Sequence, residues 1–562
     1  MLRSGLPDRQ REKIMGNKTR KNTNNFIVQG GILAIASILV RMIGLVYRIP
    51  MTAIIGDRGN TYYSCAYSIY QILLLLSSYS LPVAVSKLVS QKTANGEYRN
   101  IQRIMKVTFA FALTVSGIFA VATYFGAPFL ADTIVNTPLA YISLRFLAPA
   151  IFVVALLGVY RGFFQGMGST LPTAISQIAE QIVNAVVSIV AAYFLFQFGT
   201  ATDLTIGMDE YKYAWGAAGG TIGTGMGALA GMLFCMFLYK AYQKHFRKMV
   251  RKDKSEQVES YGQILKLLVA TIVPVILSTA VYNLIDILDN SIYSHYMDGS
   301  VSYQKLWGAY SGKYLLLVHV PVAIASAMAA SSVPAITKAQ KAGDQKGMVR
   351  KIAVVLKCTM LIAIPAAIGL GVLGIPVIKL LYPSDTSSAG LYLTIGSLAV
   401  VLYSLSTITN GILQGVGKMN IPVRNAVISL IVHTGALVYL LWYLNMGIYG
   451  VILAYLIFGM CMATLNCFSI YRYTGYQQDL GQVYLLPGLA SVIMGIVAGL
   501  VYYLILKLTD SNAVSVLIAI AAAVVVYGVL LLLMKVVTEE ELKNMPKGDL
   551  LIRLFKKMKL MK

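Results

Sequence analysis

The stretch Ile38–Met51 has the sequence ILVRMIGLVYRIPM, in which Arg41 and Arg48 interrupt an otherwise apolar run. The run belongs to a longer apolar segment, 26–49, and an α-helix needs about 20 apolar residues to cross roughly 30 Å of hydrocarbon. We therefore predict a membrane-spanning helix here. A charge inside the hydrocarbon is costly and by default functional, so the two arginines also mark a candidate site.

The composition of the whole chain supports a membrane protein. The 562 residues are 57% hydrophobic and 12% charged, with a mean hydropathy of +0.69, whereas soluble proteins carry about 25% charged residues. The net charge of +24 does not indicate a nucleic-acid partner, because a basic face with interleaved aromatic side chains is absent. We expect no metal, no cofactor and no disulfide framework, since all five cysteines fall in predicted spans.

The apolar segments predict an all-α polytopic protein with about fourteen membrane helices. The expected spans cover residues 26–49, 62–86, 107–125, 140–160, 172–196, 214–239, 263–289, 313–333, 352–373, 390–411, 422–444, 447–471, 483–507 and 513–534. The basic segment before the first span lacks a signal-peptide cleavage site, so we expect that span to be retained.

The positive charges predict the orientation of these spans. If the N-terminus is cytoplasmic, the inner segments hold 36 of the 47 lysines and arginines, the outer loops hold 4, and the remainder lie in spans. Cytoplasmic loops carry such an excess, so we predict that both termini lie in the cytoplasm. The outer loops are too short to form a domain that houses an active site.

A weak internal repeat predicts the arrangement of the helices. The sequence GFFQGMG at 162–168 runs into Pro172 after the fourth span, and GILQGVG at 411–417 runs into Pro422 after the tenth. Features six helices apart have the same orientation, which indicates two parallel six-helix lobes related by an axis along the membrane normal. The expected regions are a cytoplasmic N-terminus (1–25), an N-lobe (26–239), a basic cytoplasmic linker (240–262), a C-lobe (263–471), two further helices (483–534) and a basic cytoplasmic tail (535–562).

The arginines of the first span lie on one face with two small residues. Ser37, Arg41, Gly44 and Arg48 follow the spacing i, i+4, i+7 and i+11. Arg41 would lie roughly 22 Å from the inner end of the helix and 12 Å from the outer end, so it must either line a wet cavity or pair with a buried carboxylate. Arg48 either joins that cavity or extends to the outer rim.

Two further spans carry polar residues at helical spacing. Span five has Gln177, Glu180, Gln181, Asn184 and Ser188, which form either a cavity wall or a hydrogen-bonded seam between helices.

Span seven, the repeat counterpart of the first, has Asn283, Asp286 and Asp289. We expect Asp289 to be solvated near the outer end, and Asp286 to bind H⁺ or Na⁺ or to pair with Arg41, for which Glu180 is the other candidate. His319 and His433 are isolated, and we expect both to be hydrogen-bonded core residues.

The sequence contains no motif for catalysis. The segment Gly411–Lys418 differs from a phosphate-binding loop in its glycine spacing, and Met419 follows its lysine where Ser or Thr is required. Neither a nucleophile elbow nor a zinc-protease motif is present. We therefore expect a transporter rather than an enzyme, driven by H⁺, Na⁺, the membrane potential or the substrate itself.

Three motifs carry a resemblance to a known family. The arginine segment with its continuation through Pro50 to Gly56, the sequence SLPVAVSKLV at 80–89 and the Gln-Gly-x-Gly turns resemble the polysaccharide-transporter branch of the multidrug/oligosaccharidyl-lipid/polysaccharide exporter superfamily. Within it the chain is similar to the bacterial lipid II flippases and the stage V sporulation protein B group. The resemblance is specific in the first two spans and mainly architectural beyond the sixth.

The resemblance implies a function and a site. It implies a flippase that moves an undecaprenyl-pyrophosphate-linked sugar from the inner to the outer leaflet by alternating access, with Arg41 and Arg48 in a central cationic cavity. The sequence departs from Gram-negative flippases in span two, where Tyr62 replaces an Asp and 67–82 lacks their Arg and Glu. That departure bears on which lipid is carried.

The expected partners and the alternatives follow from this reading. The partners are a lipid-linked oligosaccharide, the bilayer of a bacterial plasma membrane and the cell-wall synthesis machinery, with the chain a monomer. The main alternative is a cation-coupled multidrug exporter of the same superfamily, for which Asp286 and Glu180 argue and Arg41 argues against. An intramembrane glycosyltransferase and a non-transporting scaffold for wall synthesis are weaker alternatives.

Overall fold

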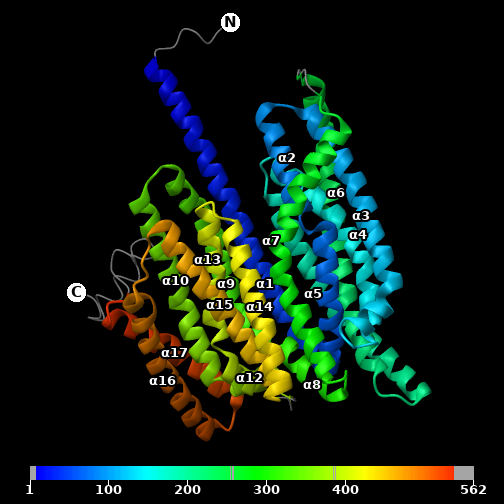
Figure 1. Cartoon of the computed structure of the whole chain (residues 1–562), viewed down its shortest axis with the longest axis vertical. Helices are drawn as coiled ribbons and strands as arrows, with labels where there is room; N and C mark the ends of the chain where they lie inside the picture. The colour runs from blue at the N-terminus through cyan, green and yellow to red at the C-terminus, as the bar shows by residue number, and fades with distance from the viewer. Residues whose placement is uncertain (1–7, 254, 256–257, 384, 386–387, 537–562) are drawn as a thin grey trace.

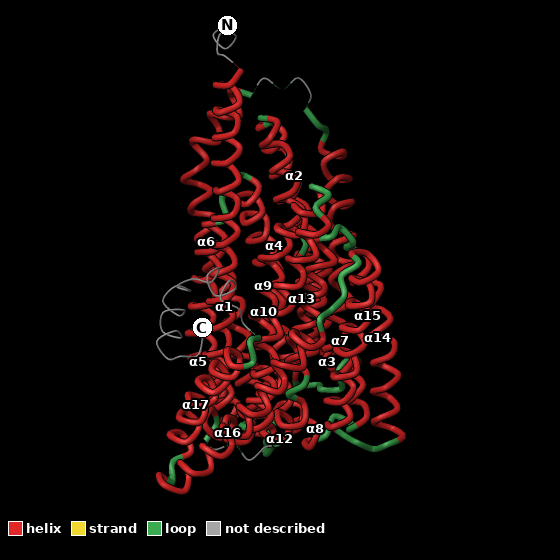
Figure 2. The backbone as a smooth tube through the Cα atoms, turned by 90° about the vertical axis from the view of Figure 1, so that its left-hand side faces the viewer, coloured by secondary structure: helices red, strands yellow, loops and turns green. Residues whose placement is uncertain are grey.

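The structure is a computed structural model of the whole chain and describes residues 8–253, 255, 258–383, 385 and 388–536. Every regular element of these residues is a helix (Figure 2). The elements of the first half are α1 (Asp8–Leu74), the short π-helical segment η1 (Leu75–Tyr79), α2 (Leu81–Asn95), α3 (Tyr98–Thr133), α4 (Ala140–Gly166), α5 (Leu171–Ile206) and α6 (Tyr211–Lys252).

The second half begins with α7 and contains shorter elements. They are α7 (Tyr261–Tyr296), α8 (Val301–Ala309), η2 (Tyr310–Tyr314), α9 (Leu315–Lys341), α10 (Gln345–Val372), α11 (Gly374–Leu381), α12 (Ala389–Gly396), α13 (Ala399–Gly415), α14 (Asn420–Val438), η3 (Tyr439–Tyr443), α15 (Ile448–Thr474), η4 (Gly481–Leu485), α16 (Leu486–Thr509) and α17 (Asn512–Leu533).

The prediction of an all-α polytopic membrane protein is confirmed. Among the described residues, eleven helices are long and apolar enough to span a bilayer, or twelve if α12 and α13, bent by 56°, form one span. The expected count of fourteen is not confirmed. The continuous helical stretch from Ala36 to Asn95 covers the predicted span 62–86 and part of the predicted span 26–49.

The backbone at Gly56 separates those two predicted spans. Gly56 has φ 66° and ψ −176° inside an otherwise helical segment, in the left-handed region that glycine adopts without steric cost. Two helical arms of α1 therefore meet at this residue, one before Gly56 and one after it. In Figure 1 the chain enters at the top, runs down along the first arm and returns to α2 near the top. We call the end of the bundle at Gly56, opposite the start of α1, the distal end.

The internal repeat corresponds to one local structure formed twice. Gly168 and Gly417 both have positive φ, 88° and 81°, directly after the ends of α4 and α13. The helix before each turn also packs closely on an earlier helix. A Cβ at Gly166 would lie 2.9 Å from the carbonyl oxygen of Ser86, and one at Gly415 would lie 3.3 Å from that of Val333.

The helices form two groups (Figure 1). We call α1–α6 the N-lobe and α7–α15 the C-lobe. Helix α7 contacts α1, α2 and α3 of the N-lobe as well as α14 and α15, so it connects the two groups. Helix α16 packs on α10, and α17 on α16 and α11. Much of the predicted linker 240–262 is helical, because α6 continues to Lys252 and a capping box of Ser260 and Gln263 starts α7.

Candidate functional site

Arg48 lies in an aromatic environment on the first arm of α1. Its guanidinium donates a hydrogen bond to the hydroxyl of Tyr63, 3.3 Å away, and lies 4.9 Å from the centre of the same ring. Tyr63 stacks on Tyr67 at 5.6 Å, and Tyr67 lies 5.7 Å from Tyr70. The second arm of α1 thus supplies a row of tyrosines next to the cation, which holds the guanidinium in one place without neutralising it.

Arg41 and Ser37 lie about two and three helical turns before Arg48. Arg41 is exposed, and Ser37 and Arg48 are half-buried. The positive charges of Arg41 and Arg48 both act electrostatically on His319 of α9. His319 is itself exposed. The arginine face of α1 is therefore directed toward the C-lobe, and His319, which we expected in the core, instead shares the exposed region with the arginines.

The polar residues of α5 divide between two neighbouring helices. A Cβ at Gly44 of α1 would lie 3.2 Å from Nε2 of Gln181, so this part of the stripe faces α1. Asn184 is 8% exposed, and its amide donates to the hydroxyl of Tyr47 at 3.5 Å. Ser188 donates to Asn184 at 2.9 Å and to the carbonyl oxygen of Gly220 in α6 at the same distance. Asn184 therefore belongs to a packed seam, whereas Gln177 is half-buried.

Glycines at every fourth position of α6, from Gly219 to Gly231, explain how closely this seam packs. A Cβ at Gly219 would lie 2.4 Å from the backbone of Ala191, and one at Gly227 would lie 2.5 Å from the carbonyl oxygen of Glu180. Small residues at this spacing allow two helix backbones to approach each other. These glycines therefore allow α5 and α6 to pack closely.

The carboxylate of Glu180 has a different partner from the one we considered. Its Oε2 lies 2.7 Å from the guanidinium of Arg161 in α4, and both side chains are mostly buried. Arg161 also donates to Ser176 at 2.9 Å. The sequence placed Arg161 in an inner loop, so the pair was not anticipated. Glu180 thus neutralises Arg161 rather than Arg41.

The acidic residues of α7 differ sharply in their surroundings. Asp286 is exposed and Asn283 half-buried, whereas Asp289 is 3% exposed. Our expectation of a solvated Asp289 is therefore wrong, because α14 places His433 2.5 Å from its Oδ1. Among the residues that the structure describes, no ion pair joins Arg41 to Asp286. In the sequence, the sign of the contact between His433 and Asp289 is a single histidine within a predicted membrane span.

The lobes are joined at the distal end by charged side chains. The ammonium of Lys313 in η2 lies 2.6 Å from Oδ1 of Asp57 in α1 and also contacts Asp385, in the segment between α11 and α12. Arg58 donates to Oε1 of Gln304 in α8 at 2.9 Å and pairs with Glu210 at 3.3 Å. The sequence predicts Arg58 in an outer loop and Lys313 at the start of a span, and it does not predict that these two cations join the lobes.

The backbones of the two lobes also touch at the distal end. A Cβ at Gly308 of α8 would lie 1.7 Å from the carbonyl oxygen of Asp57. Thr61 donates to the carbonyl oxygen of Gln304 at 2.5 Å, and Trp307 donates from Nε1 to Ser64 at 3.1 Å. This distal interface, formed by residues 57–65 of α1 with α8 and η2, closes that end of the molecule.

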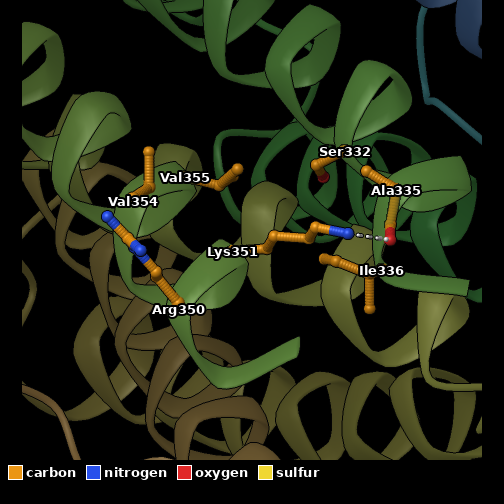
Figure 3. Close-up of a pocket in the computed structure, with 7 residues that line it drawn as sticks. All are labelled: Ser332, Ala335, Ile336, Arg350, Lys351, Val354 and Val355. Carbon is orange, nitrogen blue, oxygen red and sulfur yellow. Dashed lines mark hydrogen bonds between the residues drawn. The ribbon is translucent and has the colours of Figure 1, made fainter. Parts of the chain in front are cut away.

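A hollow of about 240 Å³ lies between α9 and α10, and neither Arg41 nor Arg48 lines it. Its lining is mostly apolar. Lys351 reaches across it to the carbonyl oxygen of Ala335 at 3.1 Å, and Arg350, which also lines the hollow, points away from Ala335 (Figure 3). No group of three or more metal-ligating side chains occurs in the described part of the chain.

Comparison with known proteins places this geometry among membrane transporters. A model of the family described as "Polysaccharide biosynthesis protein" matches residues 27–340, and the MatE model matches 274–440. Stage V sporulation protein B of Bacillus subtilis (strain 168) is 25% identical over 93% of this chain and 98% of its own length. Lipid II flippase MurJ of the same organism is 24% identical over 88% of this chain and 92% of its own length.

Solved structures share the fold. The inward closed conformation of lipid II flippase MurJ matches with a TM-score of 0.61 and 20% identity, covering 89% of this chain and 97% of that one. An inward-facing multidrug resistance MATE family transporter matches with a TM-score of 0.58 and 15% identity, covering 79% and 98%. At these identities the likeness concerns the fold.

Proposed function

The chain belongs to the polysaccharide biosynthesis protein family of the multidrug/oligosaccharidyl-lipid/polysaccharide exporter superfamily, and from this premise we propose that it flips a lipid-linked cell-wall or polysaccharide precursor. It is a multi-pass transporter of the bacterial plasma membrane and not an enzyme. The proposed cargo is an undecaprenyl-pyrophosphate-linked sugar of the lipid II kind, carried from the inner to the outer leaflet. Its pyrophosphate cannot cross hydrocarbon unaided.

The observation that carries the proposal is the arginine face of α1. Arg41 is exposed and Arg48 is half-buried among tyrosines, and neither takes part in a salt bridge among the described residues. Two guanidinium groups seven residues apart provide charge-assisted, bidentate hydrogen bonds to a pyrophosphate. Ser37 lies on the arginine face of α1 and Gln177 on the polar stripe of α5, and in this proposal both add neutral hydrogen bonds, while the buried Asn184 holds α5 to Tyr47 of α1.

Alternating access follows from where the lobes touch. The distal interface holds the lobes together at one end, and we infer from the positive-inside bias that this end faces the outside of the cell. We infer that the arginines face the cytoplasm in this structure, that the head group enters from that side, and that parting of the distal interface releases it outside. The prenyl tail stays in the bilayer during the movement.

The test compares variants of three arginines that lie in predicted membrane spans. Arg41→Ala and Arg48→Ala should each abolish growth of a flippase-depleted strain that depends on this protein, and should stop flipping of purified lipid II in proteoliposomes. Arg145→Ala is the matched control, because Arg145 also lies in a span but stacks on Tyr124 and Tyr141. Full activity of the Arg41→Ala/Arg48→Ala double variant at normal expression would refute the proposal.

A cation-coupled multidrug exporter is the second candidate. It is favoured by the exposed Asp286 and by the MatE match over 274–440, since a carboxylate suits cationic drugs. In that case a drug-resistance panel would show protection that Asp286→Asn removes, and purified lipid II would not be flipped.

A further inference from the structure

The hollow between α9 and α10 combines a charged rim with an apolar floor (Figure 3). Ser332 and Ile336 of α9 are buried and form its floor, whereas Ala335, Arg350 and Lys351 are exposed at its rim. Its volume of about 240 Å³ is below the roughly 300–1,000 Å³ of a pocket that encloses a whole small molecule. The hollow therefore fits one part of a larger ligand.

The two cations at the rim lack a carboxylate partner. Among the residues that the structure describes, neither Arg350 nor Lys351 forms an ion pair. Lys351 donates to the carbonyl oxygen of Ala335 at 3.1 Å, which uses one of its three N–H groups. Asp344, the nearest acidic residue in the sequence, accepts from the backbone N–H of Gly347 at 2.8 Å and caps α10. Both cations are therefore available to an anion.

The surrounding ends of the two helices are also basic. Lys338 and Lys341 lie in the last turn of α9, and Lys346 lies in the first turn of α10. Between residues 337 and 351 the chain has five lysines and arginines and one acidic residue. The charge around the hollow therefore favours an anionic ligand over a neutral or cationic one.

The hollow lies where the charged end of α10 meets its apolar part. Val354 and Val355 also line the hollow. They follow Arg350 by about one helical turn and belong to the predicted span 352–373. The hollow thus presents cations on one side and hydrocarbon on the side toward the middle of the membrane.

The apolar surface continues deeper on both helices. Ile362 lies three turns beyond Lys351 on the same face of α10. Ile324 lies three turns before Ala335 on the same face of α9. Both isoleucines are 39% exposed. The contact between Lys351 and Ala335 therefore marks the polar end of a surface that is apolar three turns deeper.

The hollow lies on a different side of α9 from the arginine face of α1. The positive charges of Arg41 and Arg48 act on His319 of α9. Ala335 follows His319 by 16 residues, which at 3.6 residues per turn is about 160° around the helix. The hollow therefore does not belong to the site that we propose for the pyrophosphate.

We propose that this hollow binds an anionic phospholipid of the bilayer. The lipid phosphate accepts hydrogen bonds from Arg350 and Lys351, the glycerol backbone fills the hollow, and an acyl chain follows the apolar surface toward Ile324 and Ile362. A free phosphate uses the charged rim alone, and a soluble acidic protein does not reach side chains within the hydrocarbon. A phospholipid uses both parts. From the positive-inside bias we infer that it comes from the cytoplasmic leaflet.

The test locates the bound lipid on the full-length protein in liposomes without a transport substrate. Phosphatidylglycerol with a diazirine close to its head group is activated by light, and the crosslinked peptides are identified by mass spectrometry. Crosslinks within 332–336 and 350–355 should be at least about tenfold more frequent than those from phosphatidylcholine with the same diazirine. Equal crosslinking by the two lipids at the hollow would refute the site.

The start of α16 serves as the comparison segment. Leu489 and Ile493 are exposed there, and residues 473–506 contain no lysine or arginine. The two lipids should react equally with this segment. If phosphatidylglycerol is preferred there as strongly as at the hollow, the preference is not specific and the proposal fails.

Matched variants separate the hollow from the general charge of this end. Arg350→Gln/Lys351→Gln should lower the phosphatidylglycerol crosslinks at the hollow at least about tenfold. Lys338→Gln/Lys341→Gln removes the same charge from residues that do not line the hollow, and should lower them less than about threefold. Equal losses in the two double variants would show a diffuse attraction and refute the site.

Val354 provides a test that leaves both cations in the chain. Val354→Asp places a carboxylate one turn after Arg350, where the two side chains pair, and should remove the preference for phosphatidylglycerol. Val354→Asn has a similar shape without the charge and should keep that preference. A preference that persists in Val354→Asp would refute the site.

Competition in the wild-type protein distinguishes a lipid from a free anion. Glycerol phosphate in excess carries the same phosphate without an acyl chain and should leave the crosslinks unchanged. If it displaces the lipid, the hollow binds a free phosphate ester and the assignment to a phospholipid is overturned. Flipping of lipid II is assayed separately, so failure of the proposed transport function leaves this result unaffected.

Discussion

The ammonium of Lys313 lies 2.6 Å from the carboxylate of Asp57, across the boundary between the lobes. Lys313 is 4% exposed and contacts Asp385 as well. A buried cation between two carboxylates is favourable only while all its partners are present, because removal of one charge leaves the others uncompensated. The distal interface is therefore held by charges that a conformational change must separate.

Replacement of Lys313 should weaken this interface most. Lys313→Met leaves Asp57 and Asp385 close together without a cation, and a loss of about 3–5 kcal/mol is expected for a broken buried pair. Asp57→Asn leaves Lys313 with Asp385 and should cost less. Thermal unfolding in detergent measures both variants, and equal losses would contradict the arrangement.

Addition of one methyl group should force the distal end apart. A Cβ at Gly308 would lie 1.7 Å from the carbonyl oxygen of Asp57, whereas one at Gly369 of α10 meets nothing within 4 Å. Gly308→Ala should therefore shift the protein toward a state open at the distal end and slow flipping, and Gly369→Ala should have no such effect. Distances between spin labels on the two lobes report the shift, and an unchanged distribution in Gly308→Ala would show that the helices do not meet this closely.

We expect that a lysine cannot take over the function of Arg48. Its ammonium lacks the planar fork that binds a pyrophosphate through two parallel hydrogen bonds, so Arg48→Lys should lower the flipping rate by at least about tenfold, the equivalent of 1.4 kcal/mol. Tyr63→Phe removes the hydroxyl that Arg48 bonds but keeps the ring below the guanidinium, and should retain most activity. If Tyr63→Phe lost more flipping activity than Arg48→Lys, this would indicate that Arg48 serves only to bind Tyr63.

The orientation of the chain predicts which residues an impermeant reagent reaches. Met208 lies at the distal end and Lys341 at the end of α9, and from the charge distribution we predict that the end with Lys341 faces the cytoplasm. In intact cells, a cysteine at Met208 should react with an impermeant maleimide, and one at Lys341 should react only after lysis. Labelling of Lys341→Cys in intact cells would show that the chain has the opposite orientation in the membrane.

Acidification should loosen the turn after α2. Lys92 bonds Glu97 at 2.8 Å, and this contact holds the pKa of the Glu97 carboxyl below its ordinary value. A carboxyl with a lowered pKa stabilises the folded chain above the ordinary value of about 4.3, and this contribution disappears as the pH falls through the lowered pKa. Glu97→Gln should therefore lose less stability than wild type as the pH falls from about 4.3 through the lowered pKa of the Glu97 carboxyl, by up to about 1 kcal/mol. If the melting temperatures of the wild type and of Glu97→Gln fall in parallel as the pH is lowered, this prediction is refuted.

The sequence by itself determined the membrane helices and the repeated turn. Hydropathy is a property of consecutive residues, so the apolar segments predicted a polytopic helical protein. The turns that contain Gly168 and Gly417 are likewise local, because a positive φ depends on the residue itself. The spacing of Arg41 and Arg48 also placed both on one face of a helix without knowledge of any other helix.

Only the tertiary structure decided which charges meet. Glu180 pairs with Arg161 and Asp289 with His433, 144 residues away, and neither pair follows from spacing. Hydropathy gives the depth of a residue along its helix, but the rotation and tilt of each helix depend on packing, such as the approach of α6 to α5 along Gly219 and Gly227. The same polar stripe of α5 was therefore compatible with a cavity wall or a packed seam until the neighbouring helices were in place.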